Sequence, residues 1–371
     1  MSSASRDASD IIHRNDYQTR YINYTKKKQN TIGAIVNILG GSAGANDASE
    51  VIYITIGGTL LADSNLNNDT IIPVSLVYTQ YYNPARTPLA TVATDDGVFM
   101  IDGSSNLFNV SLDTSVSLPE PIKAIAVDFN QNIYVTTSTN VYSYLYESNA
   151  FISMNITGLT NISALTVGSN FYFLQAGSSQ IFQASSNGAA TVIAGSTSGF
   201  AEGIGSDAQF NRLKGIALDP TGQYLYVADS GDSLIRMIST VSPYMVSTVA
   251  GNPIGFYSPF PTDDVGNRDG SIIDNDTLLY YPEGVTVTES GVVYIADTNN
   301  NNIRSLYGGV LSTIAGQPGV PPIFDVSPIG FTDDITAKSL WNSPSHISAF
   351  KRSLYVTEPL NNAIRVITLV Y

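Results

Sequence analysis

One stretch of the sequence occurs in two similar copies, and this repeat constrains the fold more than any other feature. Residues 215–238 read GIALDPTGQYLYVADSGDSLIRMI, and residues 284–307 read GVTVTESGVVYIADTNNNNIRSLY. Each copy contains an apolar run, a turn with glycine, a second apolar run that ends in Asp, and a third run that carries Ile-Arg. Short runs rich in Val, Ile, Tyr and Leu between Gly, Asn, Asp and Ser turns predict consecutive antiparallel strands.

The same pattern occurs six times, and a fourth apolar run completes the clearest copies. That fourth run is MVSTVAG (245–251) after the first quoted copy and LSTIAG (311–316) after the second. The predicted second strands of the six copies centre on Phe99, Tyr134, Tyr172, Tyr226, Tyr294 and Tyr355. Four-stranded units repeated along a chain pack face to face around an axis. We therefore expect an all-β fold, a six-bladed β-propeller of four-stranded antiparallel blades.

The clearest copies also resemble a known family. Residues 199–238, GFAEGIGSDAQFNRLKGIALDPTGQYLYVADSGDSLIRMI, are similar to NHL repeats, which have an apolar strand ending in Asp, a second strand like YVAD, and Ile-Arg in the third. The resemblance is strong over 199–317 and weaker in the other blades, and it does not cover residues 1–70. It implies a six-bladed NHL-type β-propeller.

The last copy stops after its third strand, so its fourth strand has to come from elsewhere in the chain. An open blade would leave unpaired backbone groups along its edge. Residues 70–80 read TIIPVSLVYTQ, and VSLVYT resembles the fourth run VSTVAG. We expect residues 71–79 to supply this outer strand, so that an N-terminal strand closes the ring and the propeller covers 71–371.

Two further segments precede the propeller. Residues 1–30 carry a net charge of +3, whereas the remainder has eleven basic and twenty-eight acidic residues. We expect residues 1–30 to form a basic arm. In residues 31–70, TIGAIVNILG and EVIYITIGGTLL predict strands, so this part is expected to be an irregular β segment or flap.

The arm, helical or extended, is the strongest candidate for docking to another protein. Ser9 or Asp10 would cap a helix over residues 9–28, in which aromatic and basic residues recur along one face. The residues that we expect to dock are Tyr17, Arg20, Tyr21, Tyr24 and Lys28. Residues 1–24 also resemble short N-terminal segments of virion proteins of large DNA viruses, which implies a place in a virion or capsid.

Composition narrows the possible partners and compartments. The acidic body argues against nucleic acid as a partner, because phosphate binding needs clustered Lys and Arg. The chain has no cysteine, which argues against disulfides and thiolate chemistry. No apolar h-region opens the sequence and no apolar run reaches eighteen residues, so we expect neither a signal peptide nor a membrane span. The expected location is intracellular or in a virion.

Several residues bear on a possible active site. Asp229 with Arg236 and Asp297 with Arg304 recur in the repeat, so we interpret them as turn caps or ion pairs between strands. GGSAG at 40–44 has the spacing of a serine nucleophile motif, but neither a following helix nor a suitable histidine is evident. Two acidic loops, 260–277 and 324–338, are predicted to lie on one face. Their site candidates are Asp263, Asp264, Asp333 and Asp334.

The sequence favours a binding protein over an enzyme. We expect a non-enzymatic scaffold propeller without a cofactor, which joins a hetero-oligomeric assembly such as a viral capsid through its arm and loop faces. The alternative is a calcium-dependent, lactonase-like hydrolase with its site at the channel mouth, which requires several converging oxygen ligands. The blade pattern places Ala217, Thr286 and Ser348 near the axis instead.

Overall fold

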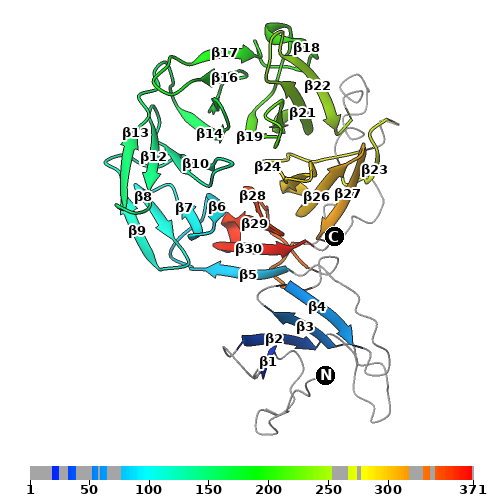
Figure 1. Ribbon diagram of the computed structural model, residues 1–371. Helices are drawn as coiled ribbons and strands as arrows, with labels where there is room; N and C mark the ends of the chain where they lie inside the picture. Colours follow the sequence, from blue (N-terminus) through cyan, green and yellow to red (C-terminus); the bar gives the residue numbers. More distant parts are fainter. Residues whose placement is uncertain are drawn as a thin grey trace. The chain divides into compact units, whose positions relative to one another are not determined.

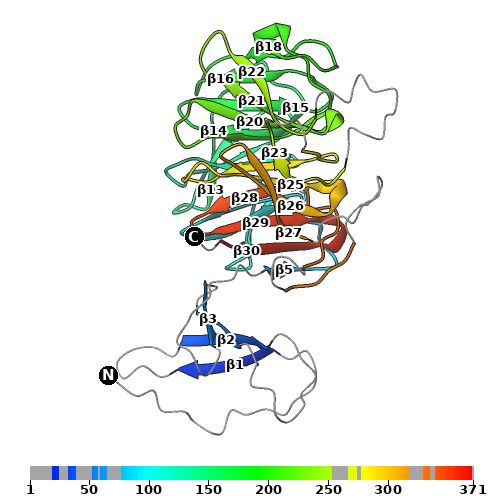
Figure 2. The same ribbon diagram turned by 90° about the vertical axis from the view of Figure 1, so that its right-hand side faces the viewer.

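The computed structural model has two compact units, residues 1–76 with 368–371, and Val77–Ile367. The second unit is a ring of six antiparallel sheets, a six-bladed β-propeller (Figure 1). Figure 2 shows this ring from its side. The structure describes the backbone of residues 19–24, 32–38, 52–56 and 59–64, and residues 77–252, 266–273, 277–316, 329–334 and 339–369 in full.

Blades 1 to 3 are regular four-stranded sheets. Their strands are β6–β9 (Ala90–Thr94, Gly97–Ile101, Asn106–Asn109, Thr114–Ser117), β10–β13 (Ala124–Val127, Ile133–Thr136, Val141–Leu145, Ala150–Ser153) and β14–β17 (Ile162–Val167, Phe171–Gln175, Ile181–Ala184, Thr191–Ala194). In each blade the first strand is innermost and the fourth is outermost, because neighbouring strands follow chain order.

Blades 4 and 5 add a short fifth strand at the outer edge, and 3-10 turns follow the second strands of blades 4 to 6. The strands are β19–β22 (Leu213–Leu218, Tyr224–Asp229, Leu234–Ser239, Met245–Ala250) with β18 (Gly203–Ile204), β24–β27 (Gly284–Val287, Val293–Asp297, Asn302–Tyr307, Val310–Ala315) with β23 (Gly270–Ser271), and β28–β30 (Ile347–Phe350, Ser353–Glu358, Ala363–Thr368). The turns are η3 (Ser230–Asp232), η5 (Thr298–Asn300) and η7 (Pro359–Asn361), and η2 (Gly205–Asp207) precedes blade 4.

Strand β5 (Val77–Tyr82) closes the ring by pairing with β30 as the outer strand of blade 6 (Figure 1). The register sets Val77 opposite Ile367 and Tyr82 opposite Ala363. The expected closure by an N-terminal strand is thus confirmed, and the described strand lies a few residues later than 71–79. The six predicted second strands and the six-bladed fold are also confirmed.

Each apolar core lies between two neighbouring blades. Phe173 of blade 3 belongs to one core with Val141 of blade 2, and Met100 of blade 1 belongs to another with Ile364 of blade 6. Because both faces of a blade are covered by its neighbours, strands such as β30 are buried along their whole length. The blades therefore depend on one another for burial of apolar surface.

The N-terminal unit contains one antiparallel sheet in the order β1–β2–β3–β4. Its strands are Thr19–Tyr24, Ile32–Ile38, Ile52–Ile56 and Thr59–Ser64. The expectation of a helix over residues 9–28 is wrong for Thr19–Tyr24, which pair with β2 from Thr19 opposite Asn37 to Tyr24 opposite Ile32. The physical reason is composition, since TRYINY is rich in Thr, Tyr and Ile, which favour strands. The rest of 9–28 lies outside the described residues.

Candidate functional site

A channel follows the axis of the propeller between the innermost strands of the six blades. It consists of two cavities of about 310 and 320 Å³ that share wall residues. We call the first the hairpin half, because the turns between the first and second strands of several blades surround it. We call the second the crossover half, because the chain enters the innermost strands there. Ala217, Thr286 and Ser348 line the hairpin half, which confirms their predicted position near the axis.

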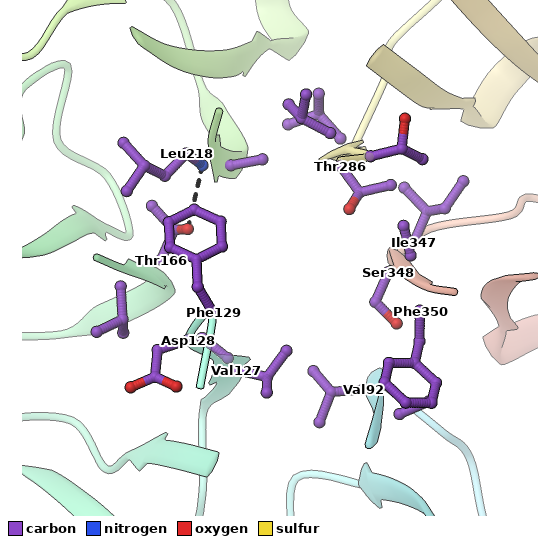
Figure 3. Close-up of a pocket in the computed structure, with 18 of the residues that line it drawn as sticks. Val92, Val127, Asp128, Phe129, Thr166, Leu218, Thr286, Ile347, Ser348 and Phe350 are labelled. Atoms are coloured by element: carbon purple, nitrogen blue, oxygen red, sulfur yellow. Dashed lines mark hydrogen bonds between the residues drawn. The ribbon is translucent and has the colours of Figure 1, made fainter. Parts of the chain in front are cut away.

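Two phenyl rings stand at the opening of the hairpin half. Figure 3 shows Phe129 of blade 2 and Phe350 of blade 6 on opposite sides of this opening. Phe129 is 58% exposed, which is high for so large an apolar side chain. Beside Phe129, the hydroxyl of Thr166 accepts a hydrogen bond from the Leu218 amide at 3.2 Å. The inner wall here is therefore apolar with single hydroxyl groups.

Charged groups at this opening bond to neighbouring protein groups. The Asp128 carboxylate accepts bonds at 2.9 Å from the amides of Asn130 and Asn132, within its own turn. The Lys351 ammonium forms an ion pair with Asp95. Both arrangements leave the charges at the rim, where water screens them, rather than in the wall of the channel.

His346 lies where the two halves of the channel meet. Its Nδ1 accepts a hydrogen bond from the Thr91 amide at 3.3 Å, which fixes the neutral imidazole with its proton on Nε2. The ring has some access to the channel but is far from bulk solvent, and this burial lowers the pKa of His346 to about 4. In the crossover half, Lys214 pairs with Glu283 at 3.0 Å.

In the part of the chain that the structure describes, no three His, Asp or Glu side chains lie close enough together to hold a metal ion. The acidic residues that line the channel, Asp128, Glu283 and Glu289, belong to its two ends rather than to one converging set.

The acid and arginine residues of the repeat form ion pairs inside blades 4, 5 and 6. All six side chains are fully buried, which confirms the interpretation as ion pairs between strands. The pairs are Arg236–Asp229 at 3.0 Å, Arg304–Asp297 at 2.7 Å and Arg365–Glu358 at 3.2 Å. Buried charges need such partners, because a charge that is removed from water is stabilised only by an opposite charge and hydrogen bonds nearby.

A second carboxylate reaches two of these arginines from the loop before the blade. Asp269 accepts a bond from Arg304 Nη2 at 2.6 Å, and Asp333 accepts one from Arg365 Nε at 3.1 Å. Asp333 also accepts a 2.8 Å bond from the Thr79 amide in β5. The sequence predicted these loops as an acidic face, and it missed that both carboxylates bond inside the blade.

The predicted site residues are only partly described. Arg20, Tyr21 and Tyr24 lie on β1, and the backbone carbonyl of Asp334 accepts a bond from the Val77 amide. Outside the described residues lie Tyr17, Lys28, Asp263, Asp264 and the Ser42 motif. Docking by the arm and by the acidic loops therefore stays a prediction.

Blade 6 carries an exposed apolar cluster that the repeat pattern of the sequence did not predict. Its side chains, which we call the blade-6 cluster, are Tyr82, Ile329, Phe331 and Leu360. The ring centroids of Tyr82 and Phe331 are 5.9 Å apart, and the two residues are 58% and 43% exposed. The loop and η7 meet here, since Asn361 Nδ2 donates to the Gly330 carbonyl at 3.2 Å. Exposed apolar clusters of this kind are typical of protein contacts.

Comparison with known proteins supports the repeat. The sequence pattern of the NHL repeat matches residues 279–304. The chain is a six-bladed β-propeller with an NHL repeat in blade 5. The protein SUPPRESSOR OF QUENCHING 1, chloroplastic, of Arabidopsis thaliana is 27% identical over 209 residues, which are 55% of this chain and 18% of that protein. The chain thus spans less than a fifth of the length of this relative.

Solved structures share the fold at low sequence identity. A structural genomics protein of unknown function from Bacteroides thetaiotaomicron superimposes with a TM-score of 0.62 at 16% identity, covering 95% of this chain and 94% of that one. An auxiliary nutrient binding protein from the same species gives 0.59 at 14% identity, with 94% and 88% covered. Virginiamycin B lyase of Staphylococcus aureus gives 0.50 at 11% identity, with 80% and 100% covered. These comparisons give no support to the virion resemblance of residues 1–24.

Proposed function

We propose that this chain is a non-enzymatic, protein-binding propeller that serves as a scaffold subunit of a larger assembly. The observation that carries the proposal is the blade-6 cluster, an exposed pair of aromatic rings together with exposed Ile329, two residues before Phe331, and exposed Leu360 in η7. Aromatic and aliphatic side chains that stay exposed side by side gain free energy when a partner covers them.

The disposition of charge agrees with this proposal. The acid and arginine groups of blades 4 to 6 are bonded inside the blades, as in the buried pair of Asp297 and Arg304. Such groups stabilise the fold and do not face a substrate. The virion or capsid version of the proposal depends on the sequence of residues 1–24 alone.

The test is affinity purification from the source cells with the full chain and three variants. Tyr82→Ser with Phe331→Ser removes the blade-6 cluster, and Leu112→Ser is a matched control at a residue that is 57% exposed in blade 1. Reversal of Lys26–Lys28 to Glu tests the arm without removing β1. We expect one partner that the full chain and the control retain and that the cluster variant loses.

Two results would contradict the proposal. Recovery of the same partners by the cluster variant and by the full chain would show that the cluster is not the contact. Calcium-dependent hydrolysis of a lactone by the full chain would support the alternative hydrolase, whose ligands would then have to include residues outside those described.

A further inference from the structure

The hairpin half of the channel is built as a ligand site rather than as packed core. We propose that it binds a small uncharged molecule that carries an aromatic ring and a hydroxyl group, such as a phenol. This site is separate from the blade-6 cluster and independent of the protein-binding role proposed above. Its volume of about 310 Å³ lies at the lower end of the range of small-molecule pockets.

A buried hydroxyl without a partner is the first observation behind the proposal. Ser348, on the innermost strand β28, is 8% exposed, and its Oγ has no hydrogen-bonding partner among the described residues. Buried polar atoms of native proteins are nearly always bonded, so an unpartnered hydroxyl in a cavity wall indicates a missing partner. Ser348 lies in the wall of the hairpin half (Figure 3), so the missing partner can come from a molecule in this cavity.

Three further hydroxyl groups line the same cavity from other blades, and that of Thr288 bonds within its own turn. The Thr166 hydroxyl accepts its 3.2 Å bond from the Leu218 amide and so keeps its own proton for donation. Thr286 comes from the innermost strand of blade 5, next to blade 6. Figure 3 places Thr166 and Thr286 on different sides of the opening. A ligand with one hydroxyl group can therefore bond at the wall in more than one orientation.

The remaining wall favours an aromatic ring. Val92, Val127 and Leu218 supply aliphatic surface, and Phe129 and Phe350 stand on opposite sides of the opening (Figure 3). Aromatic rings gain from offset or edge-to-face contact with a second ring, in addition to the burial of apolar area. A ring that binds beside Phe129 would cover the most exposed apolar side chain of this opening.

The positions of the charged side chains around the hairpin half favour a neutral ligand. The charges at this end lie on the rim, where Asp128 bonds its own turn and Lys351 pairs with Asp95. An ion inside the hairpin half would lose its water and would find no charge in the wall below the rim, where the titratable residue is the neutral His346, so its desolvation would not be offset. A carboxylate would in addition approach Asp128 and Glu289 at the rim.

The test is a titration of the full chain with four small molecules that each contain a methyl-substituted benzene ring. Binding is measured by calorimetry or by ligand-observed NMR. The four molecules are p-cresol, toluene, p-toluate and 4-methylbenzylammonium. We expect p-cresol to bind about tenfold more tightly than toluene, and the two ions to bind more weakly than p-cresol. No binding of p-cresol at its solubility limit, or tighter binding of either ion, would overturn the proposal.

Two serine variants locate the hydroxyl contact. Ser348→Ala is expected to lower the affinity for p-cresol severalfold, with the Thr166 and Thr286 hydroxyl groups still in place, and to leave toluene binding unchanged. Ser163→Ala is the matched control, because Ser163 lines the crossover half and its Oγ is also buried without a partner among the described residues. Neither change removes a hydrogen bond between described residues, so both variants are expected to fold. Equal effects of the two variants would place the ligand elsewhere.

The phenyl ring at the opening has its own control. Phe129→Ala should lower the affinities for p-cresol and for toluene by the same factor, because it removes a contact with the ligand ring and no contact with the ligand hydroxyl group. Leu112→Ala, in blade 1 and equally exposed, should change neither affinity. Unchanged binding by Phe129→Ala would show that the ring lies outside the site.

Discussion

Asp232 in blade 4 occupies the position that Asn300 holds in blade 5, the third residue of the 3-10 turn after the second strand. Asn300 Nδ2 donates to Asp297 Oδ2 at 2.8 Å and to the Gly266 carbonyl at 2.7 Å. The side chain of Asp232 has no N–H group that could donate a hydrogen bond, and its Oδ2 is buried without a partner among the described residues. Burial raises the pKa of Asp232 to about 6, and burial together with the charge of Asp232 raises the pKa of Asp229 to about 7.

Asp232→Asn is therefore expected to stabilise the protein by about 1–2 kcal/mol near pH 7.5, because the new amide gives Asp229 a donor. The folded pKa of Asp232 is raised, so ionised Asp232 opposes folding above about pH 6, and this cost disappears as the pH falls toward 3.8. The gain should thus be largest above pH 6 and shrink toward pH 4. Urea unfolding at pH 7.5 and pH 4.5 measures both values.

Asn300→Asp is the matched control for that change. It creates in blade 5 the carboxyl pair that blade 4 has, so it should destabilise the protein most at high pH. A wild-type protein that is as stable as Asp232→Asn at pH 7.5 would contradict this account of the blade-4 pair.

Asp297→Ala tests the buried ion pairs. It removes the 2.7 Å partner of Arg304, which keeps its bond to Asp269, and it takes one acceptor from Asn300 Nδ2, so we expect a loss of about 3 kcal/mol in the free energy of unfolding. The control is Asp95→Ala, which removes the exposed pair with Lys351 and should have little effect. Chemical unfolding of both variants measures the two losses in the free energy of unfolding. Equal losses would contradict the view that burial makes the Asp297–Arg304 pair more important than the exposed pair.

The blades could be predicted from the sequence because their signals are local. A run such as YVAD followed by a polar turn and Ile-Arg fixes a strand, a turn and the next strand within about twenty residues. Ring closure could be predicted too, since a blade with three strands requires a fourth. The axial position of Ser348 follows from its place on the first strand of a blade.

Other features could not be predicted, because they join segments that are distant in the sequence. Asp333 bonds Arg365 from the loop before blade 6, and nothing in the loop itself indicates this partner. Phe129 and Phe350 lie at the same opening only because the ring arranges blades 2 and 6 around one axis. The helix expected in the arm relied on a capping residue and on the spacing of aromatic and basic residues, and the strand β1 shows that composition was the better guide for Thr19–Tyr24.

Ring closure by β5 predicts a sharp limit for N-terminal deletion. A chain that starts at residue 70 keeps the pairing of Val77 with Ile367 and should melt in one cooperative transition. A chain that starts at residue 83 lacks β5, exposes the edge of β30 and should aggregate or lose cooperative melting. Differential scanning calorimetry shows whether each of the two chains melts in one cooperative transition. A soluble, cooperatively melting chain that starts at residue 83 would contradict closure by β5.

His346 makes an opposite contribution to the pH dependence of stability from that of Asp232. Its folded pKa is lowered to about 4 against 6.5, so between these values the unfolded chain binds a proton that the folded chain does not. The contribution of His346 is therefore fully present above pH 6.5 and is lost as the pH falls toward 4. His346→Asn keeps an acceptor for the Thr91 amide and does not titrate. The difference in unfolding free energy, wild type minus variant, should rise by about 2–3 kcal/mol from pH 4 to pH 6.5 and then stay level. Parallel curves for the two proteins would show that the imidazole is protonated from the channel as readily as in water.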